Sequence, residues 1–489
     1  MTIDIKILPN DALLKIFDFI VDDNDSIDAW HPLVHVCQKW RSIVFDSPRR
    51  LKLRLHCTAE RPQAVKELLD IWPDLPIVIK LCDPPTLWGV DVVSPPLAHT
   101  DSVCEISLEV HMVATSPLDV IFAAMQVPFP ASIRVKFLPE YEAVPIAPDD
   151  PFLDEPPPHL RSFYLSQVPF PGLPTLLLLA TDLVRLTLHR IPQSGYISPE
   201  AMVTCLSSLT SLESLRLEFE SPRPRPIQER GRPPQQTFSA LPALTHFSFR
   251  GVSEYLEVLV ARIDAPVLRE LYITFFHQLI LDTPELAQFI IRTPNLKAFN
   301  EAQVMFLEDA VQVLLGSMQQ FSIQTTCKAP DWQLSFVAQV CNSSLPLIPS
   351  LEHLYIYEGK NSPSRWPDDI ENDQWLELLY PFTNAKSLYL SEEVVPRIAP
   401  ALKELVERRV TKILPCLDNL FLEEPHPSGL VDESHPSGPI DESYMSKPVQ
   451  EAIGMFITVR QLSKRPTNSR NWGGHGTSVI SQRFTGLFD

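Results

Sequence analysis

The sequence predicts an α/β protein in which a small amino-terminal helical module precedes an irregular array of strand-and-helix repeats. The pattern L-x-x-L-x-L, with conservative replacements, starts ten times at intervals of 22 to 34 residues, and helix-compatible segments such as 199–209 and 284–293 lie between copies. The chain's 489 residues also exceed the about 250 to 300 at which a single core stops growing. Because one such unit cannot bury its apolar side alone, the units should stack into a solenoid with a parallel sheet on the concave side and helices outside.

Residues 7–45 predict two short amphipathic helices joined by an acidic loop. Pro9 can stand just before a helix, and the side chain of Asn10 can accept a hydrogen bond from a first-turn amide, so the first helix should begin near Asp11. The loop 22–28 carries four carboxylates. Apolar residues recur with helical period on both sides of this loop: Leu13, Ile16, Phe17 and Ile20 before it, and Leu33, Val36, Cys37, Trp40 and Val44 after it.

Two helices of this length should bury little between them, because a unit below about 40 residues seldom supports its own core. We therefore expect the side chains of Phe17 and Trp40 to be buried against a surface outside the two helices, which belongs either to the following domain or to a second protein. In the first case the two helices are a plain hairpin that caps the next domain.

The pieces Leu8-Pro9, Ile16-Phe17 and Val36-Cys37-Gln38-Lys39-Trp40-Arg41 stand in the order of the F-box motif, which this stretch resembles. The resemblance implies docking on a Skp-family adaptor and, through it, a link to a cullin ubiquitin-ligase scaffold. The acidic loop is longer than is usual in that family. The residues predicted to bind the adaptor are Leu8, Pro9, Leu13, Ile16, Phe17, Val36, Cys37 and Trp40.

The repeat copies place three apolar residues at fixed spacing, and the later two should point into the core of each unit. The array resembles degenerate leucine-rich repeats but lacks the asparagine that regular repeats place after the strand, which predicts an irregular arc. The copies are Leu160-Phe163-Leu165, Leu183-Leu186-Leu188, Leu212-Leu215-Leu217, Leu244-Phe247-Phe249, Leu268-Leu271-Ile273, Leu296-Phe299, Met318-Phe321-Ile323, Leu351-Leu354-Ile356, Ala385-Leu388-Leu390 and Leu417-Leu420-Leu422.

Composition divides the chain into six parts. Proline is dense at 84–96 and 139–158, and the repeated HPSGLVDES and HPSGPIDES at 426–443 carry no core-forming pattern. The predicted parts are an F-box-like domain (1–50), a transition region with irregular first repeats (51–158), the repeat solenoid (159–424), a flexible linker (425–446), a capping helix (447–464) and a disordered tail (465–489).

Residues that alternate with the buried leucines should face the concave side of the sheet. Tyr and Arg are the residue types that most often carry binding energy at protein interfaces, although tyrosine also simply suits strands and stacks along a sheet. The concave-side candidates are Tyr164, Arg185, His189, Arg216, His246, Arg250, Tyr272, Tyr355, Tyr357, Tyr389 and Phe421. Those predicted to bind a partner protein are Tyr164, Arg216, Arg250, Tyr272, Tyr355, Tyr357 and Tyr389.

Residues 221–236, SPRPRPIQERGRPPQQ, interrupt the array with four arginines and five prolines. So much proline is incompatible with regular structure and predicts a protruding loop. The loop is either a solvated insertion or a basic arm for an acidic partner.

Charge and cysteine usage exclude several classes of partner. A net charge of −19 repels a phosphate backbone, so nucleic acid is not expected as the principal partner. The eight cysteines show no CxxC pair, and we expect them to be small buried side chains of a protein in a reducing compartment. The first residues lack a signal-peptide pattern and no apolar run approaches about 20 residues, which predicts an intracellular protein without membrane contact.

No motif for chemistry stands out. The sequence contains no GxSxG, HExxH, P-loop or GxGxxG pattern, so we expect neither an enzyme nor a cofactor. His31 and His35 are four residues apart on a helix, but two histidines without a third ligand make a poor metal site.

The resemblance to the F-box implies a substrate receptor of a Skp-cullin-F-box type ubiquitin ligase, and we expect an unknown target protein to bind through the repeats. Two alternatives remain. The chain is either a repeat-built interaction scaffold with no ligase link or an enzyme whose site is assembled from residues distant in sequence.

Overall fold

The computed structural model describes two compact units. One comprises residues 1–197 with 204–220, and the other comprises 198–203 with 221–489. The structure describes residues 8–22, 31–46, 55–57, 77–81, 103–110, 132–137, 160–170, 172–222, 238–278, 281–297, 299–316, 320–327, 329–346, 348–359, 372–407, 413–422, 447–462 and 468–470.

The amino-terminal helical module consists of three helices: α1 (Asn10–Asp22), α2 (His31–Val34) and α3 (Gln38–Asp46). The first begins where Pro9 and Asn10 predict, and the carbonyl oxygen of Pro9 accepts the amides of Ala12 and Leu13. The predicted second helix is divided, because the chain leaves helical geometry at residues 35–37. There the guanidinium of Arg41 donates to the free carbonyl of Val34 at 3.0 Å.

The aromatic side chains of this module cover each other. The Phe17 and Trp40 ring centroids lie 4.8 Å apart at an interplanar angle of 61°, and the two residues are 0% and 8% exposed. Such edge contacts between aromatic rings contribute roughly 0.5 to 1.5 kcal/mol beyond burial. The expectation that these two rings are buried against a surface outside the two helices is therefore wrong, because the Phe17 ring of α1 packs against the Trp40 ring of α3.

The first unit contains, among its described residues, a fully parallel sheet in the sequential order β1 to β7. In β5, β6 and β7 the apolar residues at every second position are buried, for example Phe163, Leu186 and Leu215, which confirms for these strands the period of two that the repeat pattern predicts. The strands are β1 (Leu55–Cys57), β2 (Ile77–Leu81), β3 (Val103–Val110), β4 (Ser132–Phe137), β5 (Ser162–Ser166), β6 (Arg185–Ile191) and β7 (Ser214–Phe219).

Helices α7 (Leu173–Leu179) and α8 (Pro199–Leu206) follow β5 and β6 in the chain, as the repeat pattern predicts. Leu173, Leu176 and Leu177 of α7 are buried. After α8 the hydroxyl of Ser208 donates to the carbonyl of Leu177 at 3.2 Å, which ties this turn to α7. The opposite face of the sheet, which carries the alternating polar residues, is called the open face below.

The second unit contains a mostly parallel sheet with strands in the order β9, β11, β14, β13, β12, β15, β16, β17, β18. The strands are β9 (His246–Gly251), β11 (Glu270–Phe275), β12 (Glu301–Phe306), β13 (Ala310–Leu315), β14 (Phe321–Thr326), β15 (His353–Glu358), β16 (Ser387–Leu390), β17 (Asn419–Leu422) and β18 (Asn468–Arg470); two short strands, β8 (Ser239–Ala240) and β10 (Ile263–Asp264), pair separately.

The expectation of an entirely parallel sheet fails at β13, which runs antiparallel to both β12 and β14. Only three residues separate β12 from β13, and so short a connection can join only antiparallel strands. The weak copy at Leu296-Phe299 precedes β12, which begins at Glu301. The apolar run that forms β13 does not follow the repeat spacing, so the pattern did not reveal it.

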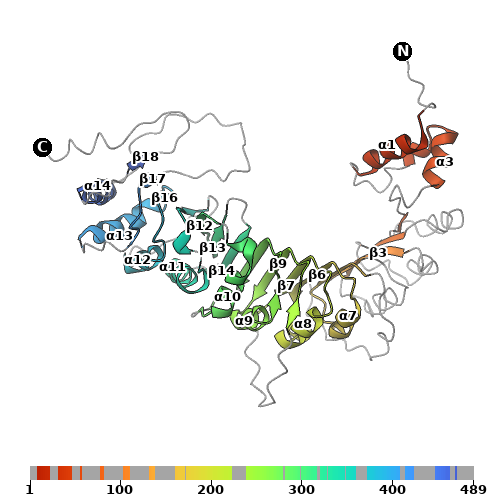
Figure 1. Cartoon of the computed structure of the whole chain (residues 1–489), viewed down its shortest axis with the longest axis horizontal. Coiled ribbons are helices and arrows are strands. Elements are labelled where there is room, and N and C mark those ends of the chain that lie inside the picture. Colours follow the sequence, from red (N-terminus) through yellow and green to blue (C-terminus); the bar gives the residue numbers. More distant parts are fainter. Residues whose placement is uncertain are drawn as a thin grey trace, which may run out of the picture. The chain divides into compact units, whose positions relative to one another are not determined.

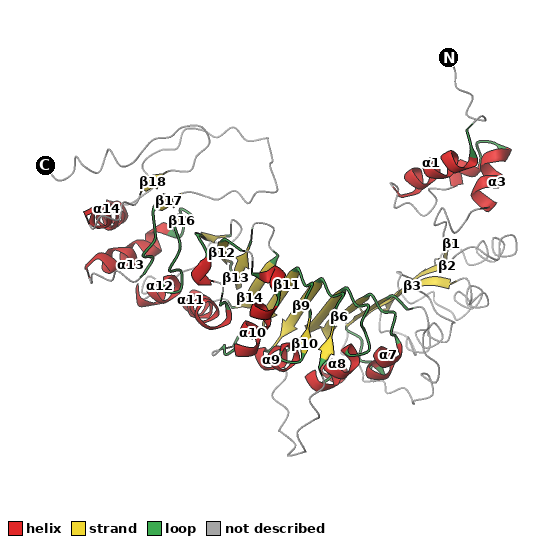
Figure 2. Cartoon of the chain, in the orientation of Figure 1, coloured by secondary structure: helices red, strands yellow, loops and turns green. Residues whose placement is uncertain are grey.

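The helices of the second unit line one side of its sheet (Figures 1 and 2). In α10, Pro284 occupies the first turn and Leu286, Phe289 and Ile290 are buried. The helices are α9 (Ser253–Val260), α10 (Pro284–Arg292), α11 (Pro330–Gln339), α12 (Asn372–Leu379), α13 (Val395–Glu407) and α14 (Lys447–Leu462).

The carboxy-terminal part differs from the prediction in one place. Helix α14 packs against α13, and the guanidinium of Arg460 donates to the carbonyl of Leu417 at 3.0 Å. Residues 468–470 lie in the tail predicted to be disordered, yet they form β18 and pair with β17. That prediction is wrong for these three residues, since the free edge of β17 offers them backbone partners.

Several predicted segments lie outside the residues that the structure describes. They are the acidic loop 23–30, most of the transition region 51–158, the arginine-proline segment 223–237 and the linker 425–446.

Candidate functional site

The helical module presents apolar side chains that its own core leaves exposed. Ile16 and Phe19 stand three residues apart on α1 and are 41% and 72% exposed. Val36, in the turn between α2 and α3, is 54% exposed. Residues three apart on a helix are neighbours, so Ile16 and Phe19 form one patch.

The predicted adaptor-binding residues fall into two groups in the structure. Leu13, Phe17 and Trp40 are buried and build the module's interior. Pro9, Ile16 and Val36 are exposed, whereas Leu8 and Cys37 are half-buried. The carbonyl of Leu8 accepts a hydrogen bond from the ammonium of Lys39 at 2.8 Å, which holds the Leu-Pro segment against α3. Phe19 was not predicted, because it lies beside the apolar stripe of α1.

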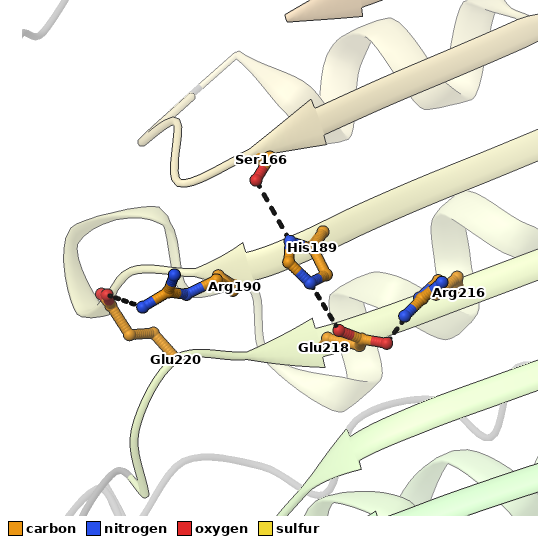
Figure 3. A network of polar contacts seen from close by, with 6 residues as sticks. All are labelled: Ser166, His189, Arg190, Arg216, Glu218 and Glu220. Carbon is orange, nitrogen blue, oxygen red and sulfur yellow. Dashed lines mark hydrogen bonds and ion pairs between the residues drawn. The ribbon is translucent and has the colours of Figure 1, made fainter. Parts of the chain in front are cut away.

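On the open face of the first unit, a line of polar contacts crosses β5, β6 and β7 at their carboxyl ends (Figure 3). The hydroxyl of Ser166 lies 3.1 Å from Nδ1 of His189, and Nε2 of His189 lies 3.1 Å from a carboxylate oxygen of Glu218. The other carboxylate oxygen of Glu218 accepts a hydrogen bond from Nε of Arg216 at 2.5 Å. Beside this line, Arg190 pairs with Glu220 at 3.8 Å.

This Ser-His-Glu order resembles a proton relay, but the geometry does not present a nucleophile. Ser166 is 3% exposed, so a substrate carbonyl has no access to its oxygen. The amide of Gln167, which could stabilise an oxyanion beside it, donates to the carbonyl of His189 at 3.0 Å. The buried carboxylate of Glu218 is instead matched by a cation and an imidazole, the condition under which a charge can be buried.

The second unit carries a related but exposed contact. His246 Nε2 and the hydroxyl of Tyr272 lie 3.1 Å and 3.0 Å from the two oxygens of Glu270. Burial and the hydrogen bond to Glu270 both raise the pKa of Tyr272. Arg250, another predicted partner-binding residue, is half-buried with its guanidinium 5.7 Å from the Phe276 ring centroid.

Further along the same face, three aromatic rings stack in register across β15, β16 and β17. The centroids of Tyr355 and Tyr389 lie 4.2 Å apart, and those of Tyr389 and Phe421 lie 4.4 Å apart, with interplanar angles of 11° and 5°. Burial raises the pKa of Tyr355 and of Tyr357, whose hydroxyl donates to Gln303 at 3.1 Å. The face of the Tyr389 ring is therefore used within the fold, and a partner could reach only the ring edges.

On the helix side of the second unit lies a shallow pocket of about 330 Å³. The carboxylate of Glu257 accepts the amides of Glu285 and Leu286 at 2.8 Å and 2.9 Å, so it caps α10. Because that carboxylate is already committed to the fold, the pocket does not present it as a reactive group. The lining residues are Phe238, Glu257, Val258, Ala261, Arg262 and Glu285.

Other kinds of site are also missing from the part of the chain that the structure describes. No three His, Cys, Asp or Glu side chains there gather as a metal site would require. None of its helices combines the length and the apolar character needed to cross a bilayer. Cys205, Cys327 and Cys341 are buried as expected, and burial raises the pKa of Cys205 to about 11. Cys416 is exposed, which corrects the expectation of uniformly buried cysteines.

Comparison with known protein families gave no match, and neither did a search of curated proteins.

Proposed function

We propose that this chain is a non-enzymatic receptor that links an adaptor protein to a target protein. In this proposal the helical module is F-box-like and docks on a Skp-family adaptor and, through it, a cullin ubiquitin-ligase scaffold. The strand-and-helix units are degenerate leucine-rich repeats whose open faces bind the target. Tethering the target near the ligase raises its local concentration, so the chain needs no chemistry of its own.

The observation that carries the proposal is the exposed apolar surface of Ile16, Phe19 and Val36 on a module whose aromatic core is already complete. Burying one such side chain against another protein contributes roughly 1.5 to 3 kcal/mol. The buried Phe17 and Trp40 then act indirectly, by holding α1 and α3 in the geometry that presents this surface.

The test is a double variant, Ile16→Asp with Val36→Asp, and we expect it to lose co-purification with a recombinant Skp-family adaptor. A carboxylate in the interface would be buried without a partner, which costs several kcal/mol. The matched control is Ile291→Asp with Val267→Asp, which changes residues of the same types at 41% and 39% exposure elsewhere in the chain. The control should bind as the unchanged chain does.

Adaptor binding at full affinity by the Ile16→Asp/Val36→Asp variant would rule the proposal out. Absence of adaptor binding by the unchanged chain would favour the second candidate, an interaction scaffold with no ligase link. The open faces with their Tyr and Arg side chains support that candidate equally well, since they need no adaptor.

A further inference from the structure

Basic side chains gather on the open face of the first unit, although the chain as a whole carries a net charge of −19. They come from β4, β6 and β7, and Arg134, Arg185, His189 and Arg216 each stand next to a buried apolar residue of their strand, as Arg134 does to Ile133. The residues are Arg134, Lys136, Arg185, His189 and Arg216. We call this set the basic face.

Strand register places part of the basic face in one row across four strands. Arg134 on β4 is paired with Tyr164 on β5, Tyr164 with Thr187 on β6, and Thr187 with Arg216 on β7. Arg185 lies on the same face of β6, two residues before Thr187, and is paired with Ser214 on β7. The row therefore has a guanidinium group at each end and two hydroxyl groups between them, and all four groups can donate hydrogen bonds.

The three arginines of the basic face are accessible, and contacts within the fold orient two of them, Arg134 and Arg216. Arg134 is exposed and lies 5.1 Å from the ring centroid of Tyr164, a contact that orients it without neutralising it. Arg185 is exposed, and its side chain makes no hydrogen bond or ion pair with the residues that the structure describes. The side chain of Arg216 remains 49% exposed although it pairs with Glu218.

We propose that the basic face binds an acidic segment of the target protein, one in which aspartate or glutamate side chains are spaced along an extended peptide. This inference rests on the proposed function in one respect, that the ligand is the target. A guanidinium fork matches a carboxylate with two parallel hydrogen bonds, and Arg216 already holds Glu218 within the fold.

The arrangement favours spaced carboxylates over one phosphate group. A phosphate dianion needs cations that converge on one point, whereas Arg134 and Arg216 are three strand spacings apart, about 14 Å. An extended peptide covers that distance in about four residues, so acidic side chains at positions i and i+4 match the row. Nucleic acid is disfavoured because the overall negative charge repels a phosphate backbone.

The experiment uses fluorescence anisotropy with the full chain and fluorescein-labelled ten-residue peptides. One peptide carries four glutamates, including an i, i+4 pair, and the second carries glutamines at those positions. The third is the glutamine peptide with a single phosphoserine. The glutamate peptide should bind with the highest affinity of the three. Added salt should lower that affinity, because the contacts are between exposed charges.

Arg134→Gln with Arg185→Gln should weaken binding of the glutamate peptide at least about tenfold, which corresponds to about 1.4 kcal/mol. Arg269→Gln with Lys403→Gln removes the same charge from exposed positions of the second unit and should leave affinity unchanged. Arg185→Gln alone, which breaks no side-chain contact with the described residues, should show part of the loss with an unchanged Tm.

Equal affinities for the glutamate and glutamine peptides would overturn the inference, as would an equal loss in the control variant. Tighter binding of the phosphoserine peptide, or of a ten-nucleotide single-stranded DNA, through the same arginines would assign the face to another ligand and also overturn it. Adaptor binding is measured separately, so Ile16→Asp/Val36→Asp can fail or succeed without affecting this result.

Discussion

The carboxylate of Glu257 shows how one residue of this fold is committed to structure. It accepts two amides of the first turn of α10, but it is also partly buried. Burial raises its pKa above the ordinary value of 4.5, and repulsion from Glu285 and Asp282 adds to that effect, while the two amides oppose it. Because the folded chain holds this proton more tightly than the unfolded chain, the contribution to stability is present below pH 4.5 and is lost as the pH rises through the raised pKa.

We therefore expect Glu257→Gln to gain stability relative to the unchanged chain as the pH rises above 4.5. The amide keeps one acceptor for the α10 cap but carries no charge to desolvate. Calorimetric Tm values from pH 4 to 7 measure this difference. Glu377→Gln, a change at an exposed position of α12, serves as control and should follow the unchanged chain throughout. A constant difference between Glu257→Gln and the unchanged chain would contradict the prediction.

Tyr389 was predicted as a binding residue, yet its ring lies between those of Tyr355 and Phe421. Tyr389→Ala removes both stacking contacts and should lower the free energy of unfolding by about 1 to 3 kcal/mol. Urea denaturation measures the change. Tyr272→Ala changes a residue that is 36% exposed and whose hydroxyl donates a hydrogen bond to the exposed side of Glu270, so it should cost less. If the two variants were equally stable, the stack would contribute nothing to the fold.

At the scale of elements, the β13 insertion depends on a glycine. Gly316 directly follows β13 and has φ +83°, a conformation that L side chains rarely adopt, and a Cβ there would lie 2.8 Å from Cδ1 of Phe299. Phe299 is 7% exposed and cannot move aside easily. We expect Gly316→Ala to destabilise the chain by about 1 to 3 kcal/mol.

Gly359→Ala is the matched control for that change. Its φ lies outside the left-handed region. The new Cβ would lie 2.7 Å from Cδ2 of Leu307, the end of a side chain that can rotate away, and at an ordinary van der Waals distance of 3.7 Å from the carbonyl oxygen of Phe306. Urea denaturation should therefore give the smaller loss for Gly359→Ala. The reverse order would show that the turn after β13 tolerates a side chain.

Strands and helices differ in how far the sequence predicted them. The strands β5, β6, β7, β9, β11, β14, β15, β16 and β17 stand where repeat copies predict them, because period-two burial is a local property of the sequence. The antiparallel direction of β13 was not predicted, since the direction of a strand depends on the neighbouring strands with which it forms hydrogen bonds. The division of the second amino-terminal helix was missed because helical spacing of apolar residues continues across residues 35–37.

At the scale of the whole molecule, charge and apolar surface are distributed unevenly. A chain with a net charge of −19 carries several arginines on one sheet face, and a module with a complete core still exposes Ile16, Phe19 and Val36. Local pairing neutralises part of that charge, since Arg216 and His189 both contact Glu218, whereas the exposed apolar side chains have no such compensation. The two proposals above each assign a partner to one of these features, and the peptide and adaptor experiments test them separately.

The sequence by itself determined the mixed α/β class, the repeating strand-and-helix units and the buried side of each strand, because these follow from the spacing of apolar residues along the chain. It also placed Tyr164, Arg185, Arg216 and Tyr389 on one side of their strands. Only the tertiary structure decided which side chains contact each other. Examples are Phe17 with Trp40, Tyr389 with Tyr355 and Phe421, and Arg134 with Tyr164. Those contacts join residues far apart in sequence, and no local pattern encodes the distance between them.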